Sequence, residues 1–291
     1  MIDDTLTVSE SGYKTQRLNA FLNAKTAIKR LQFGVDKCFV MHVGKQIPEH
    51  KKLDLHVDGW KMQEVQNVTT GHTQFKETHE GEHEVLESPI QKYLGQIISC
   101  DGSNMKNVEN RSNKGIGMAG TIKSILTNVP GGKFHFEIAV MMRNACLISS
   151  MLSCCEVWYN LTEWELRKLE WADEKLLRNI LNCSSQVSSE ILSLELGLLP
   201  VRFIIKLRRI LYLEHILKQR NKNSLLYNFF IAQMQDPKTN DWVSTVKEDL
   251  EDLDIKLEFN DIEELGTTKF TKLCKMQIQI KKHLNIFRMR N

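Results

Sequence analysis

The stretch TEWELRKLEWADEKLLRNIL, residues 162–181, decides the fold class of most of this chain. Thr162 is followed three residues later by Glu165, which is the capping-box pattern of a helix start. Apolar residues then recur at the three- and four-residue spacing of an amphipathic helix; they are Leu169, Ala172, Leu176, Leu177 and Ile180. The stretch therefore predicts a helix with one buried face.

Helical patterns continue on both sides of this stretch, beginning after the turn signal Asp101-Gly102. Pro200 suits the start of a helix, and Gly197 suits the end of one. Residues 247–264 are acidic, whereas residues 269–290 are basic and amphipathic. The chain from residue 101 onward is therefore predicted to be all-helical, with helices over 104–126, 134–158, 162–181, 188–197, 200–220 and 223–235.

The first hundred residues combine helix and strand patterns. A helix is predicted over 15–31 and strands over 38–43, 55–60 and 93–98. Polar residues 63–88 favour an exposed loop or a weak hairpin. Together the patterns predict an α+β fold in three parts, which are residues 1–100 with the strands, helical residues 101–240 and a helical tail over 241–291.

Composition indicates an ordinary globular protein. The 291 residues are 42% hydrophobic, and the net charge is only +3, so the charge balance alone does not indicate a nucleic-acid partner. The seven cysteines form no CxxC pair, which is typical of reduced intracellular thiols. The acidic start, Ile2-Asp3-Asp4, does not resemble a signal peptide. The most apolar stretch, 138–155, is interrupted by Arg143-Asn144 and serines. We therefore expect an intracellular protein without a membrane span.

Three motifs invite functional interpretations that we consider weaker than the structural ones. Residues 115–120 fit GxGxxG, but they lie inside a helical pattern, so close helix packing is favoured over nucleotide binding. His72, His79 and His83 could gather a metal ion, yet solvated histidines of a polar loop are favoured. Cys154-Cys155 is interpreted as a pair of core residues.

Asp3 and Asp4 are candidate metal ligands, because adjacent carboxylates at the tip of a hairpin can hold a divalent cation. Polymerases use two such ions to stabilise the attacking and leaving oxygens of phosphoryl transfer. Taken alone, an acidic pair of this kind is more often a solvated chain end. The residues that follow the pair shift the balance toward the functional interpretation.

An amphipathic helix, Lys37 at a strand entrance, and Tyr93-Leu94-Gly95 opening another strand follow the acidic pair in this order. The series resembles the reverse-transcriptase palm of non-LTR (LINE-type) retrotransposons, in which an aromatic-x-Asp-Asp box precedes a helix, a lysine-bearing segment and a Tyr-Leu-Gly strand. Met1 stands at the aromatic position here. The likeness covers about residues 1–220 and continues downstream through 156–158, 161–162, 167–170, 177–181 and 194–200.

The resemblance implies RNA-directed DNA synthesis with Mg²⁺ on an RNA template and a DNA primer. Asp3 and Asp4 would be the metal ligands and, together with Lys37, the catalytic residues. Tyr93, Leu94 and Gly95 would form the primer grip. Residues 1–100 would be a partial palm, and residues 101–240 a thumb-like and connection region. The alternatives are a surface lysine at position 37 and an ordinary buried strand at 93–95.

Two-metal phosphoryl transfer needs carboxylates from two strands. The family's upstream strand, with the other metal-binding aspartate, has no counterpart in this sequence. We therefore expect a truncated palm followed by an all-helical thumb-like region, and no DNA synthesis by this chain alone. Two other interpretations stay open: a non-catalytic helical protein that binds nucleic acid or a protein partner, and a remnant without retained function.

A basic helix face is the clearest nucleic-acid feature that does not depend on any family. Arg202, Lys206 and Arg209 are spaced four and three residues apart, so they share one face of the predicted helix. We expect this face to point away from the apolar side chains of the same helix. Such a cationic face could contact phosphates, and the alternative is a solvated charged face.

Overall fold

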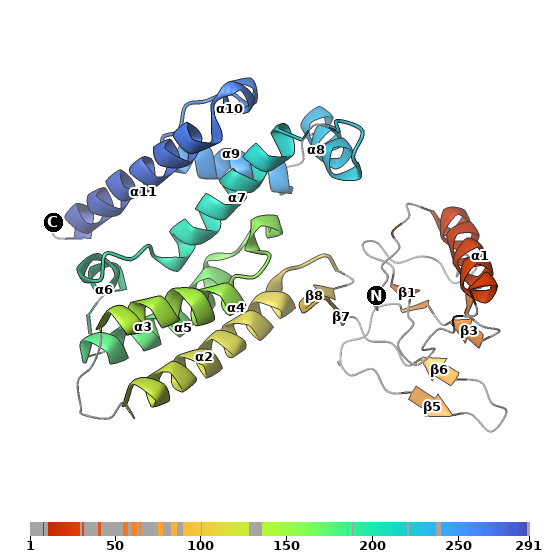
Figure 1. The fold of residues 1–291 in the computed structure, drawn as a ribbon, viewed down its shortest axis with the longest axis horizontal. Helices are drawn as coiled ribbons and strands as arrows, with labels where there is room; N and C mark the ends of the chain where they lie inside the picture. Colours follow the sequence, from red (N-terminus) through yellow and green to blue (C-terminus); the bar gives the residue numbers. More distant parts are fainter. Residues whose placement is uncertain are drawn as a thin grey trace. The chain divides into compact units, whose positions relative to one another are not determined.

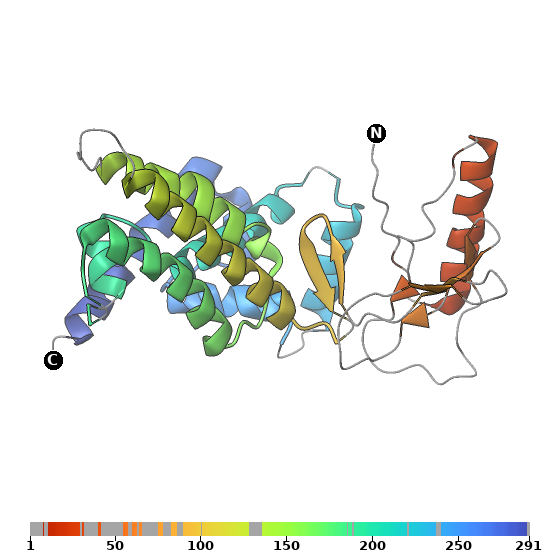
Figure 2. The same cartoon turned by 90° about the horizontal axis from the view of Figure 1, so that it is seen from below.

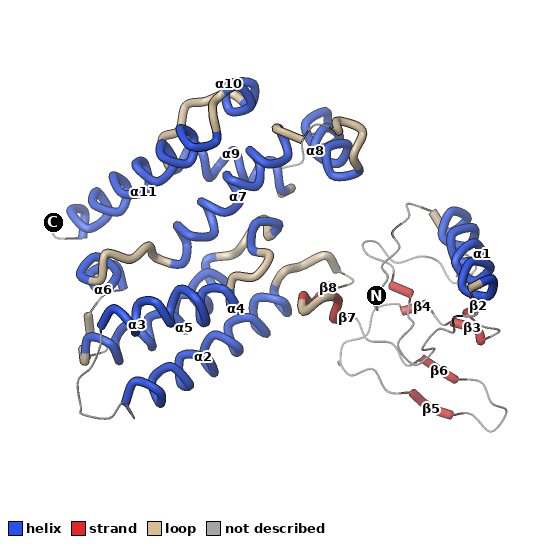
Figure 3. Tube along the Cα trace, viewed as in Figure 1, coloured by secondary structure: helices blue, strands red, loops and turns tan. Residues whose placement is uncertain are grey.

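The computed structural model describes residues 8, 11–29, 31, 40–41, 55–57, 60–62, 64–65, 75–77, 83–85, 90–99, 101–127, 136–184, 186–187, 189–219, 221–236 and 240–289. The chain divides into two compact units, Met1–Asn107 and Val108–Asn291. Helices make up most of the described residues, so the chain is α-rich (Figure 3).

The first unit has one long helix and several short strands. Helix α1 (Gly12–Ile28) begins at Ser11, whose side chain accepts a hydrogen bond from the Lys14 backbone N–H. The described strands form only two-stranded pairs: β1–β4 is parallel, and β2–β3, β5–β6 and β7–β8 are antiparallel. Their bounds are Val40–Met41, Leu55–Val57, Trp60–Met62, Glu64–Val65, Phe75–Glu77, His83–Val85, Ile90–Tyr93 and Gln96–Ser99 for β1 to β8.

Two predicted strands of this unit are hairpins in the structure. Val57 pairs with Trp60, so the expected strand over 55–60 folds back between β2 and β3. Tyr93 pairs with Gln96, so the expected strand over 93–98 is the turn and second strand of the β7–β8 hairpin. The sequence carried turn signals at both places, Asp58-Gly59 and Gly95, and the expectation of continuous strands overlooked them.

The second unit is helical. Helix α2 (Met105–Thr127) leads into it, and α5 (Glu163–Leu181) starts with the predicted capping box. The Thr162 backbone N–H donates to Glu165 Oε2 at 2.7 Å, and the Glu165 N–H donates to Thr162 Oγ1 at 3.3 Å. The other helices are α6 (Ser189–Glu195), α7 (Val201–Leu217), α8 (Leu225–Gln235), α9 (Trp242–Asp252), α10 (Phe259–Glu264) and α11 (Thr267–Met289).

The helix predicted over 134–158 is interrupted. It consists of α3 (Phe136–Met142), a π-helical segment η3 (Arg143–Ile148), α4 (Ser149–Met151) and a 3-10 turn η4 (Cys155–Val157). Cys154 adopts a left-handed backbone with φ 58° just before η4 and is exposed, whereas Cys155 is fully buried. The interpretation of both cysteines as core residues is therefore correct for Cys155 and wrong for Cys154.

Two apolar clusters form the interior of the second unit. Helices α2, α3 and α5 lie along one another (Figures 1 and 2). Together with η3, α4 and η4, they supply most of the buried residues of the first cluster. Helix α7 supplies Val201 and Ile205 to the first cluster, and Phe203 and Ile210 to the second. The second cluster also contains buried side chains of α8 to α11. The helices after residue 241 therefore share a core with α7.

No helix among the described residues is both long enough and apolar enough to span a membrane.

Candidate nucleic-acid interface

The expected metal site cannot be placed. Asp3, Asp4 and Lys37 lie outside the described residues, so their roles at Mg²⁺ and at phosphates stay predictions. His72 and His79 also lie outside the described residues, and His83 falls in β6. Within the described ranges, no group of three or more His, Cys, Asp or Glu side chains could hold a metal ion.

Tyr93, Leu94 and Gly95 lie at the tip of the β7–β8 hairpin. Leu94 and Gly95 are the two turn residues, with φ of 46° and 82°. Consecutive left-handed residues are typical of the tight turns that match the twist of the flanking strands. Leucine rarely adopts this backbone, and its side chain is 70% exposed. Only Tyr93 belongs to a strand, and the other two residues project at a loop tip.

Asn107 holds this hairpin in place. Its Oδ1 accepts a hydrogen bond from the Ile97 backbone N–H at 3.0 Å, and its Nδ2 donates to Gln96 Oε1 at 2.9 Å. The Asn107 side chain is buried, so these bonds are protected from water and fix β8 against the start of α2. The exposed tip is thus supported by an anchored strand.

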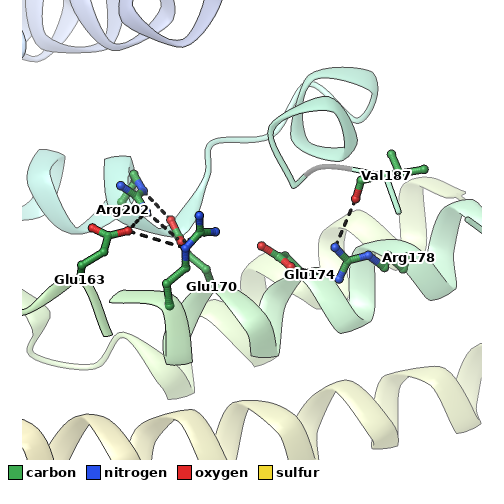
Figure 4. Close-up of polar contacts among 7 residues, drawn as sticks. Glu163, Glu170, Glu174, Arg178, Val187 and Arg202 are labelled. Carbon is green, nitrogen blue, oxygen red and sulfur yellow. Dashed lines mark hydrogen bonds and ion pairs between the residues drawn. The ribbon is translucent and has the colours of Figure 1, made fainter. Parts of the chain in front are cut away.

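Arg202 is tied to acidic residues of α5. Its Nε donates to Glu170 Oε1 at 2.6 Å, and its Nη2 donates to Glu163 Oε1 at 2.9 Å (Figure 4). The hydrogen bond with Glu170 is the main cause that raises the pKa of Arg202 above its ordinary value. Both carboxylates therefore neutralise a cation that was expected to face solvent.

Lys206 and Arg209 are tied to acidic residues of α9. Lys206 Nζ donates to Asp252 Oδ2 at 2.8 Å, and Arg209 donates to both oxygens of Asp249 at 2.8 and 3.1 Å. Arg209 also donates to the Trp158 carbonyl oxygen at 3.0 Å and is only 5% exposed. Burial raises the pKa of the Asp249 carboxyl in spite of these two cations.

The expectation of an open cationic face on α7 is therefore corrected. The three cations form a ladder that joins α7 to α5 and α9, and Arg209 lies in the interior. The sequence spacing was right, but helical spacing cannot show which acidic side chains stand opposite. Phosphate binding by Arg202, Lys206 and Arg209 stays a prediction that the geometry does not favour. A phosphate would have to displace carboxylates that already pair with these cations, and two of these carboxylates, Glu170 and Asp249, are buried.

Two further buried cations, Arg143 and Lys282, were not singled out from the sequence. Arg143, in the π-helical segment, donates through Nε to Asp173 Oδ1 at 2.7 Å and through Nη2 to the Leu199 carbonyl oxygen at 3.1 Å. Lys282 of α11 donates to the Leu198 carbonyl at 2.7 Å, and burial lowers its pKa. These contacts hold the segment between α6 and α7 in place, so we assign both cations to the stability of the fold rather than to ligand binding.

The glycine motif over 115–120 serves packing at one position. A Cβ on Gly115 would lie 2.7 Å from Met151 Sδ and 3.2 Å from Ala172 Cβ, whereas Gly117 and Gly120 have open space around them. The motif lies within α2, and no strand precedes it directly. Close packing, as predicted, explains Gly115 and leaves the other two glycines without a packing role.

The outer face of α5 carries functional candidates that the sequence reasoning missed. Trp164 and Trp171 are 50% and 52% exposed. Lys168 Nζ lies 3.8 Å from the centroid of the Trp164 ring, and Lys175 Nζ lies 5.5 Å from that of Trp171. The signal was present in the sequence, because two aromatic residues seven apart, each followed four positions later by lysine, share one helix face.

Comparison of the chain with protein-family models, with curated proteins and with solved structures found no match.

Proposed function

We propose that this chain is part of an RNA-directed DNA polymerase of the non-LTR retrotransposon lineage. In this proposal it contacts an RNA template and a DNA primer inside the cell, and residues 1–100 belong to the palm. The ordered series of motifs from Asp3-Asp4 to 194–200 supports the proposal. The structural observation that supports it most is the β7–β8 hairpin.

The tip of this hairpin suits contact with the end of a nucleic-acid strand. Gly95 has no side chain, so a backbone can approach it closely. Leu94 projects an exposed apolar side chain beside it, and Asn107 fixes the strand behind the turn. A rigidly supported tip positions a primer end better than a free loop would.

The proposal assigns binding, and not synthesis, to this chain taken alone. Asp3 and Asp4 would hold Mg²⁺, which would stabilise the charge of the transferring phosphoryl group. Two ions in line require carboxylates from two strands, and one acidic pair cannot hold both. The palm carboxylates of a complete polymerase would therefore have to act together with this pair.

Site-specific photocrosslinking tests the proposal. Leu94 is replaced by p-benzoylphenylalanine, and the purified chain is irradiated with an RNA–DNA hybrid that carries a label at the primer 3′ end. We expect crosslinks to the labelled strand at Leu94 and none at Ile125, an exposed residue of α2. Equal crosslinking at the two positions, or none at Leu94 while the hybrid is bound, would contradict a primer-contacting hairpin.

Primer extension with Mg²⁺ or Mn²⁺ tests the second part of the proposal. The chain alone is expected to add no nucleotides to a primed RNA template. Template-dependent extension that exceeds the level of an Asp3→Ala/Asp4→Ala variant would show that the chain itself is an active polymerase.

A second candidate function is non-catalytic binding by the helical unit without any polymerase role. The exposed tryptophans and lysines of α5 favour it, because they offer a binding surface far in sequence from Asp3 and Asp4. Binding of nucleic acid that leaves Leu94 without crosslinks would favour this candidate over the polymerase lineage.

A further inference from the structure

The outer face of α5 repeats one arrangement twice. Trp164 with Lys168, and Trp171 with Lys175, are each an aromatic residue followed four positions later by a lysine that lies over its ring. The two pairs are seven residues apart, which places them about 10.5 Å apart along the helix axis at 1.5 Å per residue. Two aromatic–lysine pairs therefore lie in a row on one helix face.

The helix that carries these aromatic–lysine pairs is held in place by its packing and by its capped start. Its inner face is buried in the first cluster through Leu169, Ala172, Leu176 and Leu177, and the capping box fixes its start. Both tryptophans are therefore exposed in the folded chain without any rearrangement of α5. Half-exposed indoles held on an ordered element are preorganised for stacking, because little conformational freedom is lost when a ligand binds.

The charges around the two aromatic–lysine pairs favour an anionic ligand. Lys175 has no acidic partner among the described residues, and its ammonium rests on the Trp171 ring. Lys168 pairs with Glu109 at 3.1 Å, and Glu163 and Glu170 are paired with Arg202 and Arg167. The acidic side chains nearby are therefore neutralised by their own partners. Lys175, which lies between Trp171 and the end of α5, is a cation that no carboxylate of the described residues compensates.

We propose that the outer face of α5 is a stacking platform for single-stranded nucleic acid. A base stacks on each indole, and Lys175 leaves the Trp171 ring to pair with the phosphate of the nucleotide stacked there. The spacing of the indoles corresponds to about three steps of a stacked strand at 3.4 Å per step. Recognition through π-faces and phosphates is independent of sequence. A duplex hides its base faces, so this surface discriminates in favour of single strands.

This inference does not depend on the polymerase lineage. It concerns α5, and the proposed primer contact concerns the β7–β8 hairpin, so either test can fail without the other. Crosslinking at Leu94 reports on the hairpin, whereas substitutions of the tryptophans report on α5.

Fluorescence anisotropy of the whole chain with a labelled 20-nucleotide oligothymidine tests the platform. We expect Trp164→Ala and Trp171→Ala each to weaken binding at least about fivefold, the lower end of what stacking of one base contributes. Trp164→Phe/Trp171→Phe should retain most of the affinity, because phenylalanine keeps an aromatic face. Lys175→Gln should weaken binding and make it less sensitive to salt.

The matched control is Phe229→Ala, which removes a 55% exposed aromatic side chain from α8. Its affinity should equal that of the unsubstituted chain, and circular dichroism should show the same helicity in all variants. Unchanged affinity in the double Trp164→Ala/Trp171→Ala variant would overturn the proposal. Equal affinity for a 20-base-pair duplex would overturn it too, as would binding to phosphatidylserine vesicles without binding to the oligonucleotide.

Discussion

At the scale of single residues, Gly115 is a position where α2 closely approaches Met151 and Ala172. A methyl group there would meet Met151 Sδ at 2.7 Å, and Met151 is fully buried and cannot turn away into solvent. We expect Gly115→Ala to lower the free energy of unfolding by about 1–3 kcal/mol through overpacking, reduced by the helix propensity that alanine gains. Urea denaturation followed by circular dichroism measures this change.

Gly117→Ala provides the control on the same helix. Apart from the nearby backbone of α2 itself, no atom lies within 4 Å of the added methyl group, so the substitution should raise the free energy of unfolding by about 0.5–1 kcal/mol. Equal effects at the two positions would show that Gly115 does not mark a close helix contact.

The described cysteines should differ sharply in reactivity. Burial raises the pKa of the Cys155 thiol to about 11 and that of the Cys274 thiol to about 12, whereas Cys154 is exposed. At pH 8 only about one Cys155 side chain in a thousand is a thiolate, and the thiolate is the reactive form. Iodoacetamide at pH 8 should therefore label Cys154 in the native chain and spare Cys155 and Cys274.

Peptide mass spectrometry reads out the labelling, and the urea-unfolded chain, in which all three cysteines react, is the reference. Fast labelling of Cys155 in the native chain would contradict its place in the first cluster. The sequence alone could not separate the two adjacent cysteines, because the left-handed backbone at Cys154 arises where α4 ends and η4 begins, a break that helical periodicity does not reveal.

At the scale of elements, the sequence predicted most helices of the second unit because their signals are local. Helical spacing and the capping box at Thr162 lie within the residues that they organise, and α5, α7 and α8 were expected on those grounds. The acidic partners of Arg202, Arg209 and Arg143 lie 30 to 40 residues away along the chain. Such pairings depend on how the helices pack, and no local pattern contains that information.

The stability lost when one cation of the ladder on α7 is removed should increase with the burial of that cation. Arg209→Gln leaves Asp249 buried with a weaker partner, which we expect to cost about 3–5 kcal/mol of unfolding free energy. Lys206→Gln removes a partly exposed cation that contacts Asp252 at 2.8 Å and Asp249 at 3.5 Å, but Arg209 still pairs with Asp249 in this variant, so the cost should be about 1 kcal/mol. Reversing all three charges to glutamate should therefore unfold the second unit, so loss of nucleic-acid binding in that variant would say nothing about phosphate contacts.

Urea denaturation of the two single variants measures the gradation. Arg209→Met/Asp249→Leu is the informative companion, because replacing both partners by apolar residues leaves no unpaired charge and should recover most of the lost stability. A cost for Arg209→Gln as small as that for Lys206→Gln would place Arg209 in contact with solvent, contrary to its 5% exposure.

At the scale of the whole molecule, α7 joins the two apolar clusters of the second unit into one body. Val201 and Ile205 lie in the first cluster, and Phe203 and Ile210 lie in the second. Lys282 of α11 also bonds to the Ser193 and Leu198 carbonyl oxygens beside the first cluster. Neither cluster can open without disturbing a helix that the other cluster needs.

We therefore expect the second unit to unfold in one cooperative transition. Leu176→Ala, in the first cluster, should lower stability by about 2–5 kcal/mol. It should reduce hydrogen-exchange protection by the same free energy in α5 and in the distant helices α9 and α11. Ile210→Ala, in the second cluster, should reduce the protection of α5 in return. If each substitution lowered protection only around its own cluster, α7 would be a linker between independently folded parts, and the ladder of Arg202, Lys206 and Arg209 would stabilise their junction without coupling their unfolding.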